Sequence, residues 1–272
     1  MDTLAVHRFT DILYDVADGV ARITINRPHK LNAFTPHSAR EMTEAFLAAG
    51  CDRDVRVIVL TGAGERAFSA GGDVDVDDAL AFTGAQGAEA FEVIMKDLYR
   101  AIRTCLKPVI ARVDGYAIAG GNHLAYMCDL TIASDRSVFG QAGPKVASPT
   151  EGWIVSYLVE VVGVKRAKEI WMLCRRHTAQ QAYEWGLVNA VVPAAELDTE
   201  VARWCDDLMA LSPTVLKVIK KSIDDAYSGV REQQDRFSVL KQVNAGFFDS
   251  GEPVEGTSGF LEKRPADFSP WA

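Results

Sequence analysis

The sequence contains few cysteines, and no two of them lie at a spacing typical of zinc ligands or redox-active disulfides. The 272 residues include five cysteines, at positions 51, 105, 128, 174 and 205. Because their number is odd and they are scattered, we expect neither a zinc site nor a disulfide framework. This usage is typical of a reducing compartment, and it predicts a cytoplasmic protein.

Long apolar runs and clusters of positive charge are also missing. No apolar run approaches ~20 residues, the length of a membrane-spanning helix, and residues 1–10 lack the basic flank and apolar core of a signal peptide. We therefore expect no membrane association. The net charge is −8, without a basic stripe, which argues against a nucleic-acid partner. An anionic ligand would need a few local basic residues.

No internal repeat or low-complexity linker divides the chain. Apolar runs alternate with helical patterns over the first two thirds, and the last third is helical, which predicts an α/β core with a helical C-terminal region. A hairpin is expected around Asp18-Gly19. A helix is expected from Thr35, its N-cap, to Ala49, and Thr178 and Ser212 are expected to cap two further helices. Further strands are expected at residues 57–60, 109–113, 137–140 and 187–192, further helices at about 88–104, 152–162, 164–174, 178–185, 195–210, 213–227 and 230–248, and a loop at 251–259.

Residues 73–86 form an acidic stretch with four aspartates. A solvated acidic loop and a metal site both explain such a stretch. The aspartates do not follow the spacing of a calcium-binding loop, so the solvated loop is favoured.

Two glycine-rich loops follow two apolar strands, at residues 68–73 (FSAGGD) and 119–122 (AGGN). Glycine allows positive φ and a close approach of the backbone to a ligand. The second loop also opens a predicted helix, whose N-terminal amides favour negative charge. Two amides from two such loops could converge on one oxygen, as an oxyanion hole requires.

With these loops the whole chain resembles the crotonase (enoyl-CoA hydratase/isomerase) superfamily over about residues 10–268. The resemblance implies a spiral core of repeated ββα units at residues 1–195, a helical trimerisation region at 196–272, and a homotrimer or a dimer of trimers. Its motifs are NRP with KLNA at 26–33, FSAGGD, KPVIARVDGYAIAGGN at 107–122, CDLTIAS at 128–134, FGQAGPKV at 139–146 and GLVNAVVP at 186–193.

Superfamily members bind acyl-CoA thioesters and stabilise an enolate or oxyanion on the thioester carbonyl, with CoA as part of the substrate and no tightly bound cofactor. The resemblance assigns the two stabilising amides to Gly72 and Gly120. It places Arg27 and Lys30 near the CoA phosphates, a role that suits basic residues in an acidic protein. Further substrate or CoA contacts are implied for Ala33, Ala70, Asp73, Trp153, Phe248, Phe260 and Lys263, although such aromatic residues more often belong to a core.

The two glutamates of ordinary hydratases are absent, because their family positions hold His123 and Gly143. Water addition needs such an acid and base. FGQAGPKVAS and the tail GFLEKRPADF resemble instead the branch of dihydroxynaphthoyl-CoA synthase and 2-ketocyclohexanecarboxyl-CoA hydrolase, which makes or breaks a carbon–carbon bond beside the thioester. In some synthases of that branch, the glycine at the Gly143 position leaves room for a bicarbonate base. Thr150 and Phe248 depart from the branch, where an aspartate and a tyrosine stand.

Two residues are candidates for proton transfer. Glu151 lies twelve residues before Gly163, a spacing similar to that of a catalytic aspartate in several other family members. It also lies near a predicted helix N-terminus, so stabilising that end is an equal alternative. His123 occupies a family position that faces the substrate, and it can transfer protons near neutral pH. A buried, hydrogen-bonded histidine is the alternative there.

The sequence therefore predicts an enzyme that opens or closes the ring of a cyclic β-keto acyl-CoA. Its thioester oxyanion would be held by Gly72 and Gly120. An enoyl-CoA isomerase or an atypical hydratase that uses Glu151 is the alternative. A non-catalytic CoA-binding relative is the rival from another class, which the retained glycines and Arg27 disfavour.

Overall fold

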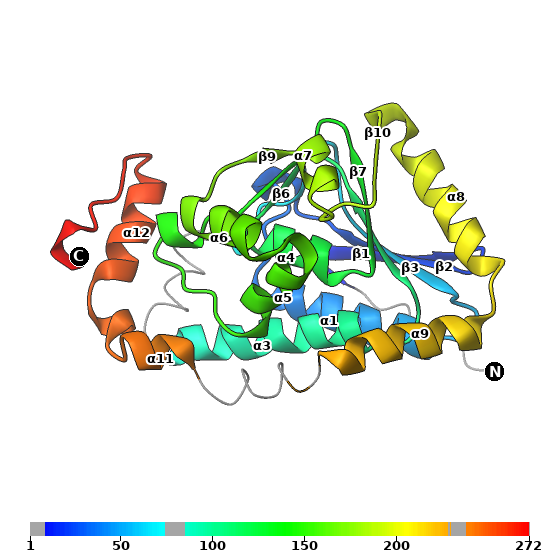
Figure 1. Ribbon diagram of the computed structural model, residues 1–272, viewed down its shortest axis with the longest axis horizontal. Helices are drawn as coiled ribbons and strands as arrows, with labels where there is room; N and C mark the ends of the chain where they lie inside the picture. The colour runs from blue at the N-terminus through cyan, green and yellow to red at the C-terminus, as the bar shows by residue number, and fades with distance from the viewer. Residues whose placement is uncertain (1–8, 74–84, 228, 230–237, 272) are drawn as a thin grey trace.

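Two β-sheets form the framework of the computed structural model, which describes residues 9–73, 85–227, 229 and 238–271 (Figure 1). The larger sheet comprises Ile12–Ala17 (β1), Val20–Ile25 (β2), Val57–Gly62 (β3), Val109–Val113 (β5), Leu130–Ser134 (β7) and Ala190–Val192 (β10), in that order. The smaller sheet comprises Ala67–Ser69 (β4), Tyr116–Ile118 (β6), Val138–Gly140 (β8) and His177–Thr178 (β9). The β1–β2 and β8–β9 pairs are antiparallel, and the other pairs are parallel.

The predicted hairpin joins β1 and β2. Asp18 and Gly19 at its tip have φ values of 50° and 80°, the left-handed conformation that a two-residue hairpin turn requires. The register pairs Ala17 with Val20 and Ile12 with Ile25. The turn signal in the sequence therefore located this hairpin correctly.

Strand–strand–helix units repeat along the chain. The helices Pro36–Cys51 (α1), Ala85–Thr104 (α3) and Gly120–Met127 (α4) follow the strand pairs β1–β2, β3–β4 and β5–β6. From the second unit on, the first strand of each pair joins the larger sheet and the second joins the smaller one. This arrangement confirms the expected α/β core of repeated ββα units. The domain boundary at residue 195 stays a prediction.

Alternate residues of the larger sheet face two different cores. On β3, Ile58 and Leu60 belong to the main core with α1 and α3, while Val57 and Val59 pack with the apolar residues of Leu197–Met209 (α8). Burying a large apolar side chain contributes roughly 1.5–3 kcal/mol. Burial on both faces explains why β3 is an unbroken apolar run instead of an alternating one.

The other helices of the described residues come after β8, with β9 and β10 between some of them. Thr35, Thr178 and Ser212 cap their helices through the predicted side-chain hydrogen bonds. Figure 1 shows α12 at the end of the molecule away from α8. These helices are Trp153–Val162 (α5), Val164–Leu173 (α6), Ala179–Glu184 (α7), Pro213–Ala226 (α9), Val239–Val243 (α11) and Glu252–Leu261 (α12), with 3-10 turns at Pro28–Lys30, Gly143–Lys145, Ala194–Glu196, Phe247–Asp249 and Ser269–Trp271.

The structure corrects two expectations. Residues 251–259 form most of α12 instead of a loop. Its glycines permit close packing, because a Cβ atom on Gly256 would lie 2.5 Å from the Val146 backbone and one on Gly259 would lie 3.1 Å from Ala266. The helix expected at 230–248 is α11 and a 3-10 turn over its described part, and the acidic residues 74–84 lie outside the described residues.

In the described part of the chain, no helix is long and apolar enough to cross a membrane. The five cysteines are free thiols. The described residues contain no cluster of three side chains suited to holding a metal ion.

Candidate active site

Two glycine loops meet where β4 and β6 end. One occupies residues 70–73, and the other opens α4 at Gly120. A Cβ atom on Gly71 would lie 2.9 Å from the Gly120 nitrogen, and a Cβ atom on Gly120 would lie 2.5 Å from the Phe34 ring. A side chain at either position would therefore push the loops apart. Their close packing explains why both positions hold glycine.

The backbone around Gly72 leaves its amide outside the local hydrogen-bond ladder. Phe34 and Gly72 form an isolated parallel β-bridge. In it, the Phe34 amide donates to the Gly71 carbonyl and the Asp73 amide donates to the Phe34 carbonyl, each at 2.9 Å. The N–H of Gly72 itself therefore points away from Phe34. Gly120 is the first residue of α4, where amides have no intrahelical acceptor. The structure thus brings together the two predicted loops. Their role toward an oxyanion stays a prediction.

Arg27 ties these loops to the N-terminal part of the chain. Its Nη1 donates to Asp73 Oδ2 at 2.8 Å and to the Ala33 carbonyl at 2.6 Å, and its Nε lies 3.7 Å from Asp11 Oδ2. The Ala70 amide donates to the Leu31 carbonyl at 3.0 Å. The Arg27 side chain is only 14% exposed. The structure therefore gives Arg27 internal partners, and its contact with CoA phosphates stays a prediction.

His123 is buried and hydrogen-bonded at both ring nitrogens. Its Nδ1 lies 3.1 Å from the Tyr99 hydroxyl, and its Nε2 lies 3.0 Å from Gln141 Oε1. The Tyr126 and Trp171 rings pack against the imidazole, at centroid distances of 5.7 and 5.3 Å. Burial lowers the pKa of His123 to about 4, against the weaker opposing effect of the Gln141 hydrogen bond. The imidazole is therefore neutral at pH 7.

Two buried donors beside His123 have no acceptor among the described residues. They are Gln141 Nε2 and Trp171 Nε1. An orphan buried donor costs roughly 1–3 kcal/mol, and such atoms are rare in native proteins. The sequence analysis did not single out Gln141 or Trp171. Gln141 lies within the FGQAGPKV motif, which was the available signal. We call Tyr99, His123, Gln141 and Trp171 the His123 cluster.

Gly143 lies two residues beyond Gln141, and its missing side chain makes room for the backbone. A Cβ atom on Gly143 would lie 2.6 Å from the Ser148 carbonyl oxygen, and the Ser148 amide donates to the Gly143 carbonyl at 3.0 Å. The space beside this glycine is therefore filled by its own loop.

Glu151 binds the N-terminus of α11. Its Oε1 accepts from the Ser238 hydroxyl at 2.8 Å, and its Oε2 accepts from the Leu240 amide. Gly152, with φ of 73°, separates Glu151 from the first residue of α5. No hydrogen bond among the described residues joins Glu151 to His123. The acid therefore stabilises a helix N-terminus, although that helix is α11 and not the expected one. Its catalytic role stays a prediction.

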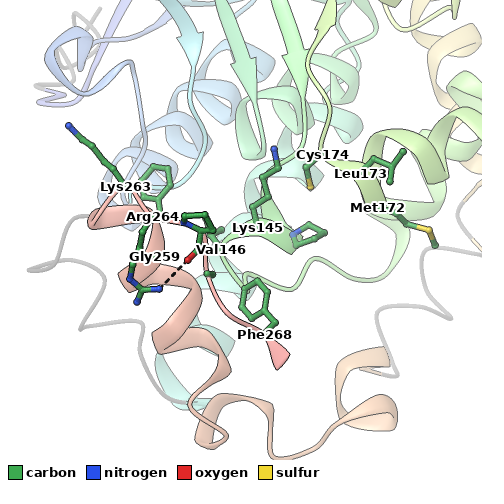
Figure 2. A pocket seen from close by; sticks show the side chains of 13 residues that line it. Lys145, Val146, Met172, Leu173, Cys174, Gly259, Lys263, Arg264 and Phe268 are labelled. Atoms are coloured by element: carbon green, nitrogen blue, oxygen red, sulfur yellow. Dashed lines mark hydrogen bonds between the residues drawn. The ribbon is translucent and has the colours of Figure 1, made fainter. Parts of the chain in front are cut away.

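Phe260 and Lys263 line a pocket at the C-terminal end of α12. The pocket has a volume of about 670 Å³. Figure 2 shows Met172 and Leu173 on one side and the end of α12 on the other. Gly72, Gly120, Glu151 and His123 do not line this pocket. Within one chain, the predicted C-terminal contacts and the oxyanion glycines therefore belong to separate places.

The other predicted contact residues lie in three places. Lys30 is half-buried at the end of the 3-10 turn that follows β2. Trp153 is buried at the start of α5, where the centroid of its ring lies 5.8 Å from that of the Tyr157 ring. Phe248 packs against Phe247 in the 3-10 turn before α12, with the two ring centroids 5.3 Å apart. Their contacts with a substrate stay predictions.

Comparisons with known proteins agree with the fold over nearly the whole chain. A family model described as enoyl-CoA hydratase/isomerase matches residues 15–270. An enoyl-CoA hydratase structure from Mycobacterium avium subsp. paratuberculosis K-10 has 27% identity and a TM-score of 0.81, covering 96% of this chain and 99% of that one. An enoyl-CoA hydratase/isomerase from Xanthobacter autotrophicus Py2 has 33% identity and a TM-score of 0.75, covering 92% and 88%. A methylmalonyl-CoA decarboxylase in complex with 2-nitronate-propionyl-CoA has 25% identity and a TM-score of 0.86, covering 96% and 98%.

Proposed function

We propose a carbon–carbon bond reaction for this chain, which belongs to the enoyl-CoA hydratase/isomerase (crotonase) family. It is an acyl-CoA enzyme of that family. The proposed reaction is the ring-opening hydrolysis of a cyclic β-keto acyl-CoA, or the reverse ring closure. The observation that carries the proposal is the contact between the two glycine loops at the start of α4.

The two amides would stabilise the enolate that this reaction forms. In the ring opening, water adds to the ring ketone. The bond from that carbon to the α-carbon of the thioester then breaks, and its electron pair becomes the thioester enolate. The enolate oxygen accepts from the Gly72 and Gly120 amides, and a proton then returns to the α-carbon. One water is consumed, and the ketone carbon becomes a carboxylate.

The catalytic groups of ordinary hydration are not available at their family positions. His123 stands where one glutamate would be, and it is a neutral, buried imidazole. Gly143 stands at the other, packed against the Ser148 carbonyl. These features support a reaction other than standard enoyl-CoA hydration. One of the matched structures is a decarboxylase by name, an enzyme that breaks a carbon–carbon bond.

Bicarbonate fits the two orphan donors of the His123 cluster. Gln141 Nε2 and Trp171 Nε1 are buried N–H donors without acceptors among the described residues, and a planar oxyanion offers several acceptor oxygens. We propose that these two residues would hold it near Gly143. When bound, it would supply a carboxylate-like base in a chain where Thr150 replaces the branch's aspartate.

Glu151 supports the second candidate, double-bond isomerisation or an atypical hydration. Its carboxylate is half-buried and fixed by two donors from the start of α11. A fixed carboxylate suits proton transfer between two carbons of a bound substrate. The same contacts suit a purely structural acid, so we rank this candidate second. A non-catalytic CoA-binding relative ranks third, because both oxyanion amides are retained.

We also propose that the protein assembles into a homotrimer or a dimer of trimers, with α9 in an interface. The outward face of α9 is apolar: Val218, Ile219 and Ile223 are 60%, 50% and 53% exposed. Its inward face carries Lys220 and Asp224, which form buried ion pairs. A helix with charges inside and apolar residues outside is typical of a surface that another subunit covers.

A mass-spectrometric screen of acyl-CoA thioesters tests the proposed reaction. The purified protein is incubated with β-keto cyclic, aromatic-succinyl, dienoyl and simple enoyl thioesters. Ring opening predicts that the cyclic β-keto thioester gains the mass of one water and that simple enoyl thioesters do not. A shifted double bond at unchanged mass, lost in Glu151→Gln, would establish the isomerase instead. Binding of CoA thioesters without turnover of any of them would favour the non-catalytic relative.

A further inference from the structure

The geometry of the His123 cluster fixes where its protons lie. Gln141 Oε1 can only accept, so the His123 Nε2 that lies 3.0 Å away carries the proton. The neutral imidazole then accepts at Nδ1, and the Tyr99 hydroxyl, 3.1 Å away, donates to it. Protons therefore point in one direction, from Tyr99 through His123 to Gln141. Gln141 is held by its oxygen, and its amide nitrogen is the orphan donor.

The opposite arrangement is worse for the buried groups. If the Gln141 amide were flipped, its nitrogen would donate to His123 Nε2, and Nδ1 would donate to Tyr99. The Tyr99 hydroxyl hydrogen would then need another acceptor, yet Tyr99 is 6% exposed and has no second partner among the described residues. The Gln141 oxygen would also become an orphan acceptor. Flipping would thus replace one orphan donor by another and add an orphan acceptor.

We propose that His123 is a positioning residue, which holds Gln141 with its amide nitrogen free and so makes this end of the substrate site selective for a ligand oxygen. His123 lies on the first turn of α4, the helix that Gly120 begins. Trp171, one of the aromatic side chains that pack against the imidazole, adds a second free donor at its Nε1. The chemical class of ligand is therefore a carboxylate, a carbonyl or a planar oxyanion such as bicarbonate.

This assignment differs from proton transfer, one of the two roles that the sequence left open for His123. The imidazole does not need to gain or lose a proton, and burial keeps it neutral. With its proton on Nε2, the imidazole donates to Gln141 Oε1 and so fixes the orientation of the Gln141 amide. The inference rests on the proposed function, because the free donors face a ligand only if the site next to Gly120 is the acyl site.

Four forms of the full-length protein test the inference, with ¹³C-labelled bicarbonate as the probe in an NMR titration. His123→Leu removes the donor to Gln141, and we expect bicarbonate binding to weaken about tenfold or more. His123→Gln keeps an N–H donor at the same reach and should restore most of that loss. Tyr99→Phe leaves the His123 imidazole and Gln141 in place but removes the hydroxyl that donates to Nδ1, so that the imidazole can adopt either tautomer. A smaller loss of bicarbonate affinity, about two- to fivefold, is expected. Thermal unfolding confirms that each variant is folded.

A second readout does not depend on any ligand. ¹⁵N NMR of the wild-type imidazole should show Nε2 protonated, and Tyr99→Phe should show a mixture of tautomers. Wild-type Nδ1 protonation, or unchanged bicarbonate binding in His123→Leu, would overturn the inference. If the wild type binds no bicarbonate while ring opening persists, the inference fails and the proposed function stands. If binding depends on His123 while ring opening is absent, the proposed function fails and the inference stands.

Discussion

Two buried polar clusters each include a residue of α3, Arg103 in one and Tyr99 in the other, and they differ in whether their hydrogen-bond partners are complete. The charged cluster consists of Arg103, Asp129, Lys220 and Asp224. Lys220 Nζ donates to Asp129 Oδ2 at 2.7 Å and to the Lys107 carbonyl at 3.0 Å, and Arg103 pairs with Asp224. None of its charged atoms is an orphan among the described residues.

The His123 cluster is neutral and incomplete. Its hydrogen bonds join Tyr99, His123 and Gln141, yet the Gln141 and Trp171 nitrogens are left without acceptors. Full desolvation makes an orphan donor costly. A complete network of charges pins α9 to the core, whereas an incomplete neutral network is suited to receive a ligand. The difference separates a structural cluster from a candidate functional one.

Breaking the charged cluster should cause the largest loss of stability. Lys220→Met keeps the size of the side chain but leaves the Asp129 carboxylate without its close cation, and we expect the free energy of unfolding to fall by about 3–5 kcal/mol. Chemical denaturation measures this change. Lys221→Met is the matched control, because Lys221 is 61% exposed and pairs with Asp225 at 2.9 Å along the same helix. It should change stability by at most about 0.5 kcal/mol. Equal effects of the two substitutions would contradict the distinction.

The His123 cluster should reveal itself through the pH dependence of stability. The folded-state pKa of His123 is lowered from 6.5 to about 4, so the unfolded chain binds a proton in this range and the folded chain does not. Stability therefore decreases as the pH falls from about 6.5 to about 4, by about 3 kcal/mol from this residue.

Denaturation curves at several pH values check this slope. Tyr99 and Tyr126 are the other titratable groups that face the ring, and burial raises the pKa of both, so neither titrates in this range. His123→Gln should flatten the slope, while the exposed His29→Gln should not. A wild-type slope that survives in His123→Gln would show that the imidazole is not held neutral by its cluster.

The outward face of α9 should affect assembly more than folding. Ile219→Asp places a charge on the exposed apolar face, so the proposed oligomer should dissociate while the chain stays folded, since exposed substitutions change stability by about 0.5 kcal/mol or less. Light scattering after size-exclusion chromatography measures the mass. The Lys221→Met protein serves again as a control. An unchanged mass for Ile219→Asp would remove α9 from the interface.

Local signals in the sequence located much of the framework. Asp18-Gly19 placed the hairpin, Thr35 and Ser212 placed helix starts, and the two glycine loops placed the candidate oxyanion site. The smaller sheet was largely missed, because β4 and β6 are three residues long and carry no periodic pattern of their own. The helix α12 was missed because Gly256 weakens its local propensity, and packing against Val146 compensates for that.

The candidate site was harder to complete from the sequence. Whether a buried nitrogen has an acceptor is a property of the packed structure, so neither the FGQAGPKV motif around Gln141 nor any pattern around Trp171 could show that their nitrogens lack one. The inward orientation of Lys220 on α9 is a property of the same kind. The sequence of α9 shows a mixture of apolar and charged residues, and only the structure shows that Lys220 and Asp224 face the core while Ile219 is exposed.

The most direct measurement compares turnover of the cyclic β-keto thioester by Gly72→Pro and Gly72→Ala. Proline removes the amide. Alanine keeps it and has room, because its Cβ would lie 3.7 Å from the nearest neighbour, the Phe91 ring. We predict that kcat falls by about 10²- to 10³-fold in Gly72→Pro and changes little in Gly72→Ala. Equal activity of the two variants would contradict the assignment of the Gly72 amide to the thioester oxyanion.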